Sequence, residues 1–414
     1  MRCPEGCLNE KPLVIQTPKM ENEEDVSDQS FHFPEEILLE ILVRLPAESI
    51  FRFRCVSKNW RCLISDPLFF SCYVARSQES PPFAFIFQSG NHKGMHWFVS
   101  TLNTLQNFSS PLFSDHFPGL KVEATSNDLI LYRSNFQEPV YFVANSFTGR
   151  CVKIPMHRSR SYGPTGLISR VRNGITTYNV VRLVKSCDSS RFCLDLETFS
   201  SENGVWRSFK ARNCTFNVEL DARPCVVYKG VLHWICNRLT ALLAYDPCRS
   251  PDECRFISLP NDAYNMNGMN AILGVSGENL YYFEMFGISI QEHKLPGWKL
   301  WVLKDYKRGE WSLDQEGKER KIESICAVSN VLSTYSPLFP VAFNPWNKDT
   351  VYFWYEGYVL TFSVKEGWFE DKLSSFSSES IVATWEIFPL SMPLCPTNFL
   401  RHHGTAANWQ RLLM

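Results

Sequence analysis

The sequence has 414 residues, which is long enough for more than one domain, because single domains usually have about 100–200 residues. Its 42 Lys and Arg residues balance 43 Asp and Glu residues, which argues against the broad basic surface of a nucleic-acid-binding protein. No run of about 18 apolar residues is present, so we expect no membrane-spanning segment.

The fifteen cysteines form no CxxC pair and no set with metal-ligand spacing, so we predict neither a metal nor another cofactor. The N-terminus lacks the basic-then-apolar pattern of a secretory signal. An odd number of cysteines without such a signal indicates reduced thiols. We therefore expect the protein in the nucleus, the cytoplasm or both.

Composition and periodicity divide the chain into five parts. We expect a disordered polar tail over residues 1–30, a helical domain over 31–75 and a linker over 76–82. A β domain over 83–395 and a C-terminal tail over 396–414 follow. The predicted fold class is therefore multi-domain, with an α domain followed by an all-β domain.

The first helix of the helical domain is predicted to start at Pro34, where the missing N–H of proline costs nothing. Glu35 and Glu36 follow at the positive end of the helix dipole. The pair Leu45-Pro46 is expected to end this helix, because a residue before proline avoids the α region. The apolar residues of this helix recur at helical spacing: Ile37, Leu38, Ile41, Leu42 and Leu45.

Two further short helices are predicted, which makes the domain a three-helix unit. Ile50, Phe53 and Val56 share a face of the second helix, and Ser57 is a candidate N-cap for a third helix that carries Trp60. A unit this close to the minimum of about 40 residues cannot bury all of its apolar side chains. Two interpretations stay open: the helices cap the β domain, or they dock on a partner protein.

Residues 33–64 resemble an F-box. The resemblance rests on Phe33-Pro34-Glu35-Glu36-Ile37, Ile41-Leu42, Leu45-Pro46 and the run from Arg52 to Trp60 (RFRCVSKNW), with Phe33 in place of the usual Leu. It implies docking on a Skp-family adaptor and, through the adaptor, on a cullin. It also implies that adaptor contacts and internal packing are divided among these residues: Phe33, Pro34, Ile37, Leu38, Ile41, Leu42, Leu45, Pro46, Ile50, Val56 and Trp60.

From Phe83 onward, short apolar and aromatic runs alternate with Gly, Asn, Asp and Pro turns, which predicts strands. No long amphipathic helix interrupts these runs, which argues against a βαβ fold. Comparable runs (at Leu129, Val180, Leu232 and Leu280) recur about every 50 residues, the size of a four-stranded propeller blade, although the step to Val351 is longer. We predict a β-propeller-like domain of about six or seven blades, with a pair of stacked β-sandwiches as the alternative.

The segments NSFTGRCVKIP, YKGVLHWI and WVLKDYKRGEW, among others, resemble the F-box-associated region of plant F-box proteins. The resemblance implies that the β domain binds a target protein. Five tryptophans are expected to pack between blades: Trp206, Trp234, Trp301, Trp311 and Trp354. The polar loops 159–166 and 261–270 are candidates for partner contact or plain surface loops.

The sequence contains no nucleophile elbow, P-loop, dinucleotide-binding fingerprint or His pair at metal-ligand spacing. His233 is expected to be a strand residue with a satisfied hydrogen bond. Asp246, Asp305 and Asp349 are expected at turns, where carboxylates bond the local backbone. We therefore predict that the chain is not an enzyme.

The favoured hypothesis is a substrate-recognition subunit of a Skp–cullin–F-box ubiquitin ligase, with an unknown target protein and no nucleic-acid or membrane partner. The alternative is a non-ligase or carbohydrate-binding propeller protein, favoured by the aromatic-rich β domain. A third hypothesis, a propeller hydrolase, requires His and carboxylate residues that converge at a central channel.

Overall fold

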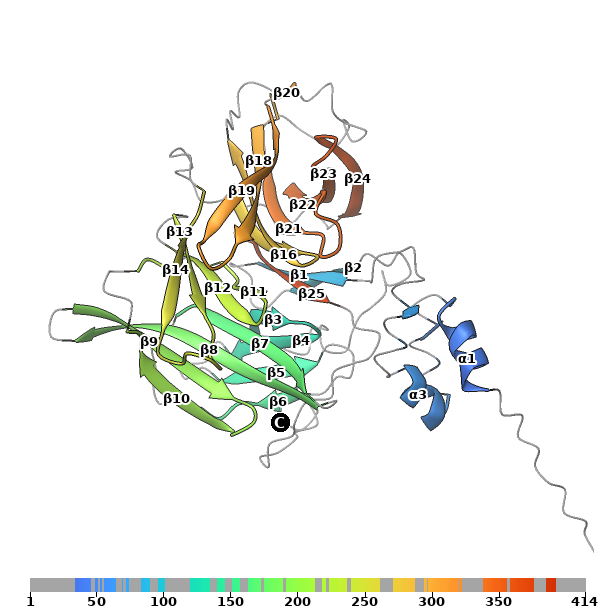
Figure 1. Ribbon diagram of the computed structural model, residues 1–414, viewed down its shortest axis with the longest axis horizontal. Coiled ribbons are helices and arrows are strands. Elements are labelled where there is room, and N and C mark those ends of the chain that lie inside the picture. Colours follow the sequence, from blue (N-terminus) through green and yellow to red (C-terminus); the bar gives the residue numbers. More distant parts are fainter. Residues whose placement is uncertain are drawn as a thin grey trace, which may run out of the picture.

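The computed structural model describes residues 34–45, 49–50, 53, 56–64, 69, 72–73, 83–89, 96–100, 120–134, 140–145, 151–156, 163–172, 175–188, 191–212, 218–220, 223–236, 240–260, 271–286, 294–295, 297–318, 320–321, 338–355, 358–375 and 385–391. The predicted tails and linker lie outside these residues. The described part consists of a small helical module followed by an all-β propeller (Figure 1).

The helical module contains helices α1 (Glu35–Leu42) and α3 (Lys58–Ile64). Residues 49–50 and 53 are also helical, but the rest of the expected second helix lies outside the described residues, so the three-helix prediction is not confirmed. Helix α1 ends at Leu42, three residues before Leu45. The N–H groups of Arg44 and Leu45 donate to the carbonyls of Ile41 and Leu42, both at 3.1 Å, so the chain continues in a tighter turn with bonds between residues three apart. No described helix is long and apolar enough to cross a membrane.

The propeller contains five complete four-stranded blades, each an antiparallel sheet. Blade 1 consists of β3 (Leu120–Ser126), β4 (Leu129–Ser134), β5 (Tyr141–Asn145) and β6 (Cys151–Lys153). Blade 2 consists of β7 (Thr165–Arg172), β8 (Ile175–Asp188), β9 (Arg191–Ser200) and β10 (Val205–Lys210). Blade 3 consists of β11 (Val226–Tyr228), β12 (Val231–Cys236), β13 (Ala241–Tyr245) and β14 (Cys254–Ser258).

The last two complete blades follow in the same order. Blade 4 consists of β15 (Ala271–Ser276), β16 (Asn279–Phe286), β18 (Gly297–Asp305) and β19 (Glu310–Gly317). A small ribbon of β17 (Lys294–Leu295) and β20 (Arg320–Lys321) extends from this blade. Blade 5 consists of β21 (Phe339–Phe343), β22 (Thr350–Tyr355), β23 (Tyr358–Ser363) and β24 (Trp368–Ser375).

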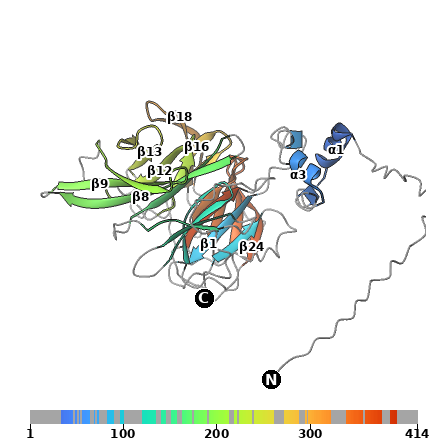
Figure 2. The same ribbon diagram turned by 90° about the horizontal axis from the view of Figure 1, so that it is seen from below.

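A three-stranded sheet, which we call the closing sheet, joins the two ends of the β domain. Its central strand β1 (Phe83–Ser89) pairs with β2 (His96–Ser100) on one side and with β25 (Trp385–Ser391) on the other. The apolar side chains of the closing sheet pack against blade 5 on one face and blade 1 on the other, so the ring is closed (Figures 1 and 2). A closed ring rules out the alternative of two stacked sandwiches.

The core of the propeller lies between neighbouring sheets rather than in one central mass. Each of six apolar clusters joins the facing surfaces of two adjacent sheets. This follows from the sequence pattern, because strands buried on both faces read as nearly continuous apolar runs. The expected number of about six or seven blades is not confirmed, since the described residues form five four-stranded blades and the three-stranded closing sheet.

Candidate docking face of the helical module

The helical module has its own apolar core. Leu42, Ile50 and Ile64 have no exposed surface, and Phe69 and Tyr73 stack on each other with ring centroids 5.9 Å apart. Every described member of this cluster belongs to the module, and none to the propeller. The interpretation of the helices as a cap packed on the β domain therefore finds no support in the described core.

The candidate docking residues divide by exposure into a core set and an outward set. Ile37 and Ile41 are 49% and 45% exposed, and Val56 is 60% exposed. Leu42 and Ile50 are fully buried, so they hold the module together and cannot contact a partner directly. The remaining described candidates are partly buried, except for Pro34, which is exposed: Leu38, Leu45 and Trp60 are half-buried in the cluster.

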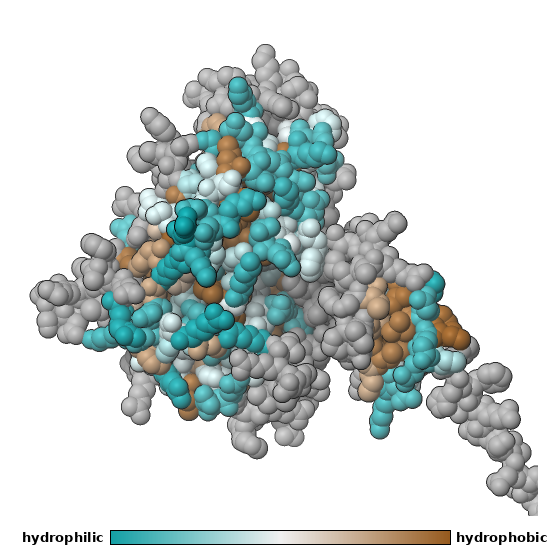
Figure 3. All heavy atoms as spheres, viewed as in Figure 1, coloured by the Kyte–Doolittle hydropathy of each residue, from teal (hydrophilic) through white to brown (hydrophobic). Residues whose placement is uncertain are grey.

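Helical geometry explains why neighbours in sequence have opposite roles. Ile37 and Ile41 are four residues apart, so they lie on one side of α1, whereas Leu38 and Leu42 lie one position further round, on the side that faces the core. We call Ile37, Ile41 and Val56 the docking face. Figure 3 shows hydrophobic surface gathered on this module. Phe33 and Pro46 lie outside the described residues.

Charged side chains border the docking face, which the sequence analysis missed. Glu40 and Arg44 form an exposed ion pair at 2.6 Å, and Arg44 also donates to the carbonyl of Glu40. Their i, i+4 spacing is the sequence signal that could have identified this pair. An exposed pair of this kind contributes little to folding, but it gives the apolar surface a polar margin.

The start of α3 is fixed as the sequence predicts. The backbone N–H of Trp60 donates to the side-chain oxygen of Ser57 at 3.1 Å, which confirms Ser57 as the N-cap. The Trp60 ring then meets Phe53 edge to face, with ring centroids 5.1 Å apart. Val56 precedes this cap and is left outside the core.

The propeller places all five predicted tryptophans between neighbouring sheets, as expected. Trp234 is fully buried between blades 2 and 3, and Trp354 packs between blade 5 and the closing sheet. Trp206 lies between blades 1 and 2, while Trp301 and Trp311 lie between blades 3 and 4. Loop 261–270 lies outside the described residues, as do most residues of loop 159–166.

His233 is a buried strand residue, as predicted, and one of its two ring nitrogens has a side-chain hydrogen-bond partner. Its Nε2 lies 2.9 Å from the hydroxyl of Tyr306, across the boundary between blades 3 and 4. Burial lowers the pKa of His233 to about 4, so the ring is neutral at physiological pH. Among the described residues, no three His, Cys, Asp or Glu side chains converge as a metal site.

Two of the three turn aspartates bond the local backbone as expected. Asp246 accepts from the N–H groups of Cys248 and Arg249, and Asp305 accepts from the N–H of Arg308. Asp349 differs, because its carboxylate accepts a hydrogen bond of 2.7 Å from Gln315 of the neighbouring blade. It therefore ties blade 5 to blade 4 rather than shaping its own turn.

Comparisons with known proteins agree with this architecture. Residues 31–72 match the F-box domain, and residues 102–371 match the β-propeller of the F-box protein At3g26010-like family. The chain is 29% identical over 297 residues to the F-box protein At5g49610 of Arabidopsis thaliana, covering 68% of this chain and 77% of that protein. It is 25% identical over 377 residues to the F-box protein At1g49990 of the same plant, covering 76% and 81%.

Solved structures match only loosely. The structure "YCF48 bound to D1 peptide" aligns with 64% of this chain and 69% of its own, at 9% identity and a TM-score of 0.36. The match to the propeller family, in contrast, spans more than half of the chain, and a separate match to the F-box domain covers the helical module. The chain is therefore a member of the At3g26010-like family of F-box proteins, with an F-box followed by a β-propeller.

Proposed function

We propose that this protein is the substrate-recognition subunit of a Skp–cullin–F-box ubiquitin ligase. One observation carries the proposal: in a module that matches the F-box, a complete apolar core leaves Ile37, Ile41 and Val56 exposed. The docking face would bind a Skp-family adaptor, and the adaptor would bring the cullin. The propeller would hold a target protein near the ubiquitin-loaded enzyme, so the chain contributes proximity and no covalent chemistry.

The energetics of the docking face suit a partner interface. Ile37 and Ile41 each keep nearly half of their surface exposed, so covering them would stabilise a complex by roughly 1 kcal/mol each. The Glu40–Arg44 pair would lie at the rim, where charges affect the rate and specificity of association more than its strength.

We also propose that the protein is located in the nucleus or the cytoplasm, where thiols stay reduced. Cys151 and Cys225 are unbridged thiols inside the propeller. Burial raises the pKa of Cys225 to about 12, which keeps this thiol protonated and unreactive.

Binding to a purified Skp-family adaptor tests the docking assignment. The double variant Ile37→Asp, Ile41→Asp should lose adaptor binding while its circular dichroism spectrum stays that of the wild type, because both side chains lie outside the core. The matched control is Met156→Asp, which changes an equally exposed apolar residue (50% exposed) on the propeller and should bind normally. Adaptor binding by the folded double variant at wild-type strength would refute the assignment.

Affinity purification with the proteasome blocked tests the ligase role. Wild-type protein should capture the adaptor, the cullin and target proteins, whereas the double variant should keep the targets and lose the other two. Targets should also accumulate in cells that express the double variant. Binding on a glycan array, together with target levels that do not respond to proteasome inhibition, would instead favour a carbohydrate-binding protein that acts outside a ligase.

A further inference from the structure

Three blades share the same hairpin between their last two strands. Gly204, Gly309 and Gly367 have φ values of +68°, +74° and +71°, a backbone conformation that side chains disfavour. The N–H of each donates at 2.8 Å to the carbonyl of the residue four positions earlier. In the hairpins of blades 2, 4 and 5, the residues that come after this glycine in the chain therefore occupy equivalent positions.

In blades 2 and 4, the second residue after this glycine is a tryptophan that reaches the previous blade. The indole N–H of Trp206 donates to the carbonyl of Pro155 at 2.7 Å, just beyond β6. The indole N–H of Trp311 donates to the carbonyl of Ser258 at 2.9 Å, at the end of β14. In both cases an indole fills the outer part of the gap between two blades and satisfies its donor on the outer strand of its neighbour.

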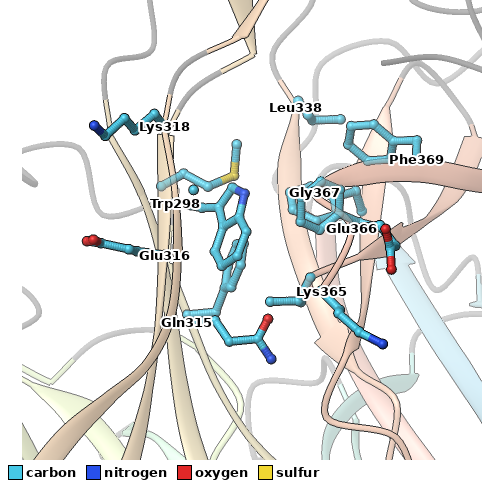
Figure 4. A pocket seen from close by; sticks show the side chains of 15 residues that line it. Trp298, Gln315, Glu316, Lys318, Leu338, Lys365, Glu366, Gly367 and Phe369 are labelled. Atoms are coloured by element: carbon cyan, nitrogen blue, oxygen red, sulfur yellow. The ribbon is translucent and has the colours of Figure 1, made fainter. Parts of the chain in front are cut away.

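In blade 5 the equivalent residue is Phe369. It stands opposite Phe362 in the strand pairing, just as Trp206 stands opposite Phe199. Phe369 is smaller than an indole and has no N–H, so it cannot make the bond that its counterparts make. A cavity of about 300 Å³ lies between blades 4 and 5, where β24 and the end of β19 face each other (Figure 4).

The cavity has an aromatic interior. Trp298 of blade 4 stacks on Phe283 at an interplanar angle of 18°, and Phe362 of blade 5 meets Trp298 edge to face. Gly317 stands opposite Trp298 in the strand pairing, and a Cβ atom at Gly317 would lie 2.4 Å from the indole. Glycine at this position is therefore what allows Trp298 to form the wall.

The mouth of the cavity is polar. Lys365 and Glu366 border it from the hairpin of blade 5 and are exposed, whereas the side chains of Glu316 and Lys318, on the strand that lines it from blade 4, point away from the cavity (Figure 4). The aromatic residues behind this mouth are nearly buried, so polar and apolar groups both line the accessible part of the cavity, whose volume of about 300 Å³ is at the lower limit of ligand sites. The cavity therefore suits one large side chain rather than a large ligand.

We propose that this cavity is a target-recognition pocket that receives a tryptophan side chain from the target protein. The propeller itself places an indole at the two equivalent positions, Trp206 and Trp311, whereas blade 5 has the shorter Phe369 at this position. The inserted indole would contact the accessible edge of Trp298 and the half-buried Leu338, and Lys365 and Glu366 would contact the chain on either side of it. This inference rests on the proposed function and adds the chemical class of side chain that the propeller recognises.

The variant Phe369→Trp tests the pocket, because it supplies the side chain that the other blades already have. The probe is N-acetyl-L-tryptophanamide, titrated against the full chain in complex with its adaptor and followed by saturation-transfer NMR. Wild-type protein should bind the probe with a Kd of about 1 mM, and Phe369→Trp should bind at least about tenfold more weakly. The control Trp368→Phe changes the neighbouring exposed aromatic residue on the opposite face of β24 and should bind normally.

A second variant covers the case in which Phe369→Trp does not fold. Leu338→Glu places a carboxylate on a half-buried wall of the pocket and should also weaken binding of the probe. Unsaturable binding by the wild type, equal binding of N-acetyl-L-leucinamide, or unchanged affinity in both variants would each overturn the proposal.

Affinity purification from cells distinguishes a failure of this inference from a failure of the proposed function. With the proteasome blocked, Phe369→Trp should lose target proteins and keep the adaptor, whereas Ile37→Asp, Ile41→Asp should lose the adaptor and keep both targets and probe binding. Loss of probe binding in the docking-face variant would contradict the pocket assignment, and normal adaptor binding by that variant would contradict only the docking assignment.

Discussion

Large apolar side chains between the blades of the propeller are buried, whereas in the helical module several large apolar side chains stay exposed. In the propeller, Trp234 and Phe283 have no exposed surface, because each strand is covered by a blade on both sides. In the module, Ile37 and Ile41 stay exposed although Leu42 beside them is fully buried. The exposed residues therefore form a second apolar surface outside a complete core. Exposed apolar surface of this kind is typical of protein interaction sites.

The largest effect should come from the core of the propeller. Trp234→Ala should lower the free energy of unfolding of the propeller by about 3–5 kcal/mol, because it leaves a cavity between blades 2 and 3. Denaturation followed by near-ultraviolet circular dichroism measures this change. Adaptor binding at low denaturant should not change; if it is lost as well, the two regions do not fold independently.

Adjacent residues of α1 give the sharpest test within the module. Leu42→Ala should destabilise the module by about 2–5 kcal/mol, since Leu42 is fully buried, whereas Ile41→Ala should change its stability by less than about 0.5 kcal/mol. For adaptor affinity, measured by calorimetry, Ile41→Ala should cost about tenfold. Equal loss of stability in the two variants would show that Ile41 belongs to the core.

The propeller contains a buried histidine whose titration should affect its stability. The pKa of His233 falls from 6.5 to about 4 on folding, because burial disfavours its charged form, and the nearby charge of Arg255 adds to this shift. The unfolded chain then binds more protons between these values, so stability is complete above pH 6.5 and falls by roughly 3 kcal/mol as the pH drops to about 4.

Urea denaturation at a series of pH values measures this dependence. His233→Leu should be less stable at pH 7, because it loses the bond to Tyr306, but its stability should change less between pH 6.5 and 4. An unchanged pH profile in this variant would mean that other groups cause the acid sensitivity of the propeller.

The smallest effect should come from the cap of α3. Ser57→Ala removes the acceptor for the backbone N–H of Trp60 and should cost the module about 1 kcal/mol, with no effect on the propeller. Thermal unfolding of the module, followed at 222 nm, measures this loss. Ser57→Asp should restore the stability, because Asp caps helices as well as Ser does; a failure of this rescue would count against a capping role.

Much of this structure could be predicted from local sequence. Strand positions followed from alternating runs and turns, and Ser57 was recognised as a cap because capping depends on residues only three positions apart. The tryptophans were assigned to the blade boundaries because large apolar residues in strands covered on both faces must pack between sheets. In each case the deciding contact is local or follows from the period of the pattern.

Other features depend on contacts that no local pattern contains. The roles of Ile41 and Leu42 could not be separated, because both are apolar and only the position of Ile50 and Ile64 decides which one faces the core. The blade number was uncertain, since the ribbon of β17 and β20 lengthens the spacing between Leu280 and Val351. The cavity beside Phe369 became visible only when blades were compared in three dimensions.

The pairing of β25 with β1 has a consequence for the order of events during synthesis. Strand β1 is synthesised early, but its partner strand Trp385–Ser391 is among the last described residues. The seven residue pairs between the two strands can form only after β25 has been synthesised. N-terminal domains generally fold first as the chain emerges. Under the proposed function, the F-box would engage its adaptor while the propeller is still an open ring. A chain that terminates before β25 would then occupy adaptor without a finished propeller, and we expect such a truncation to inhibit the intact protein.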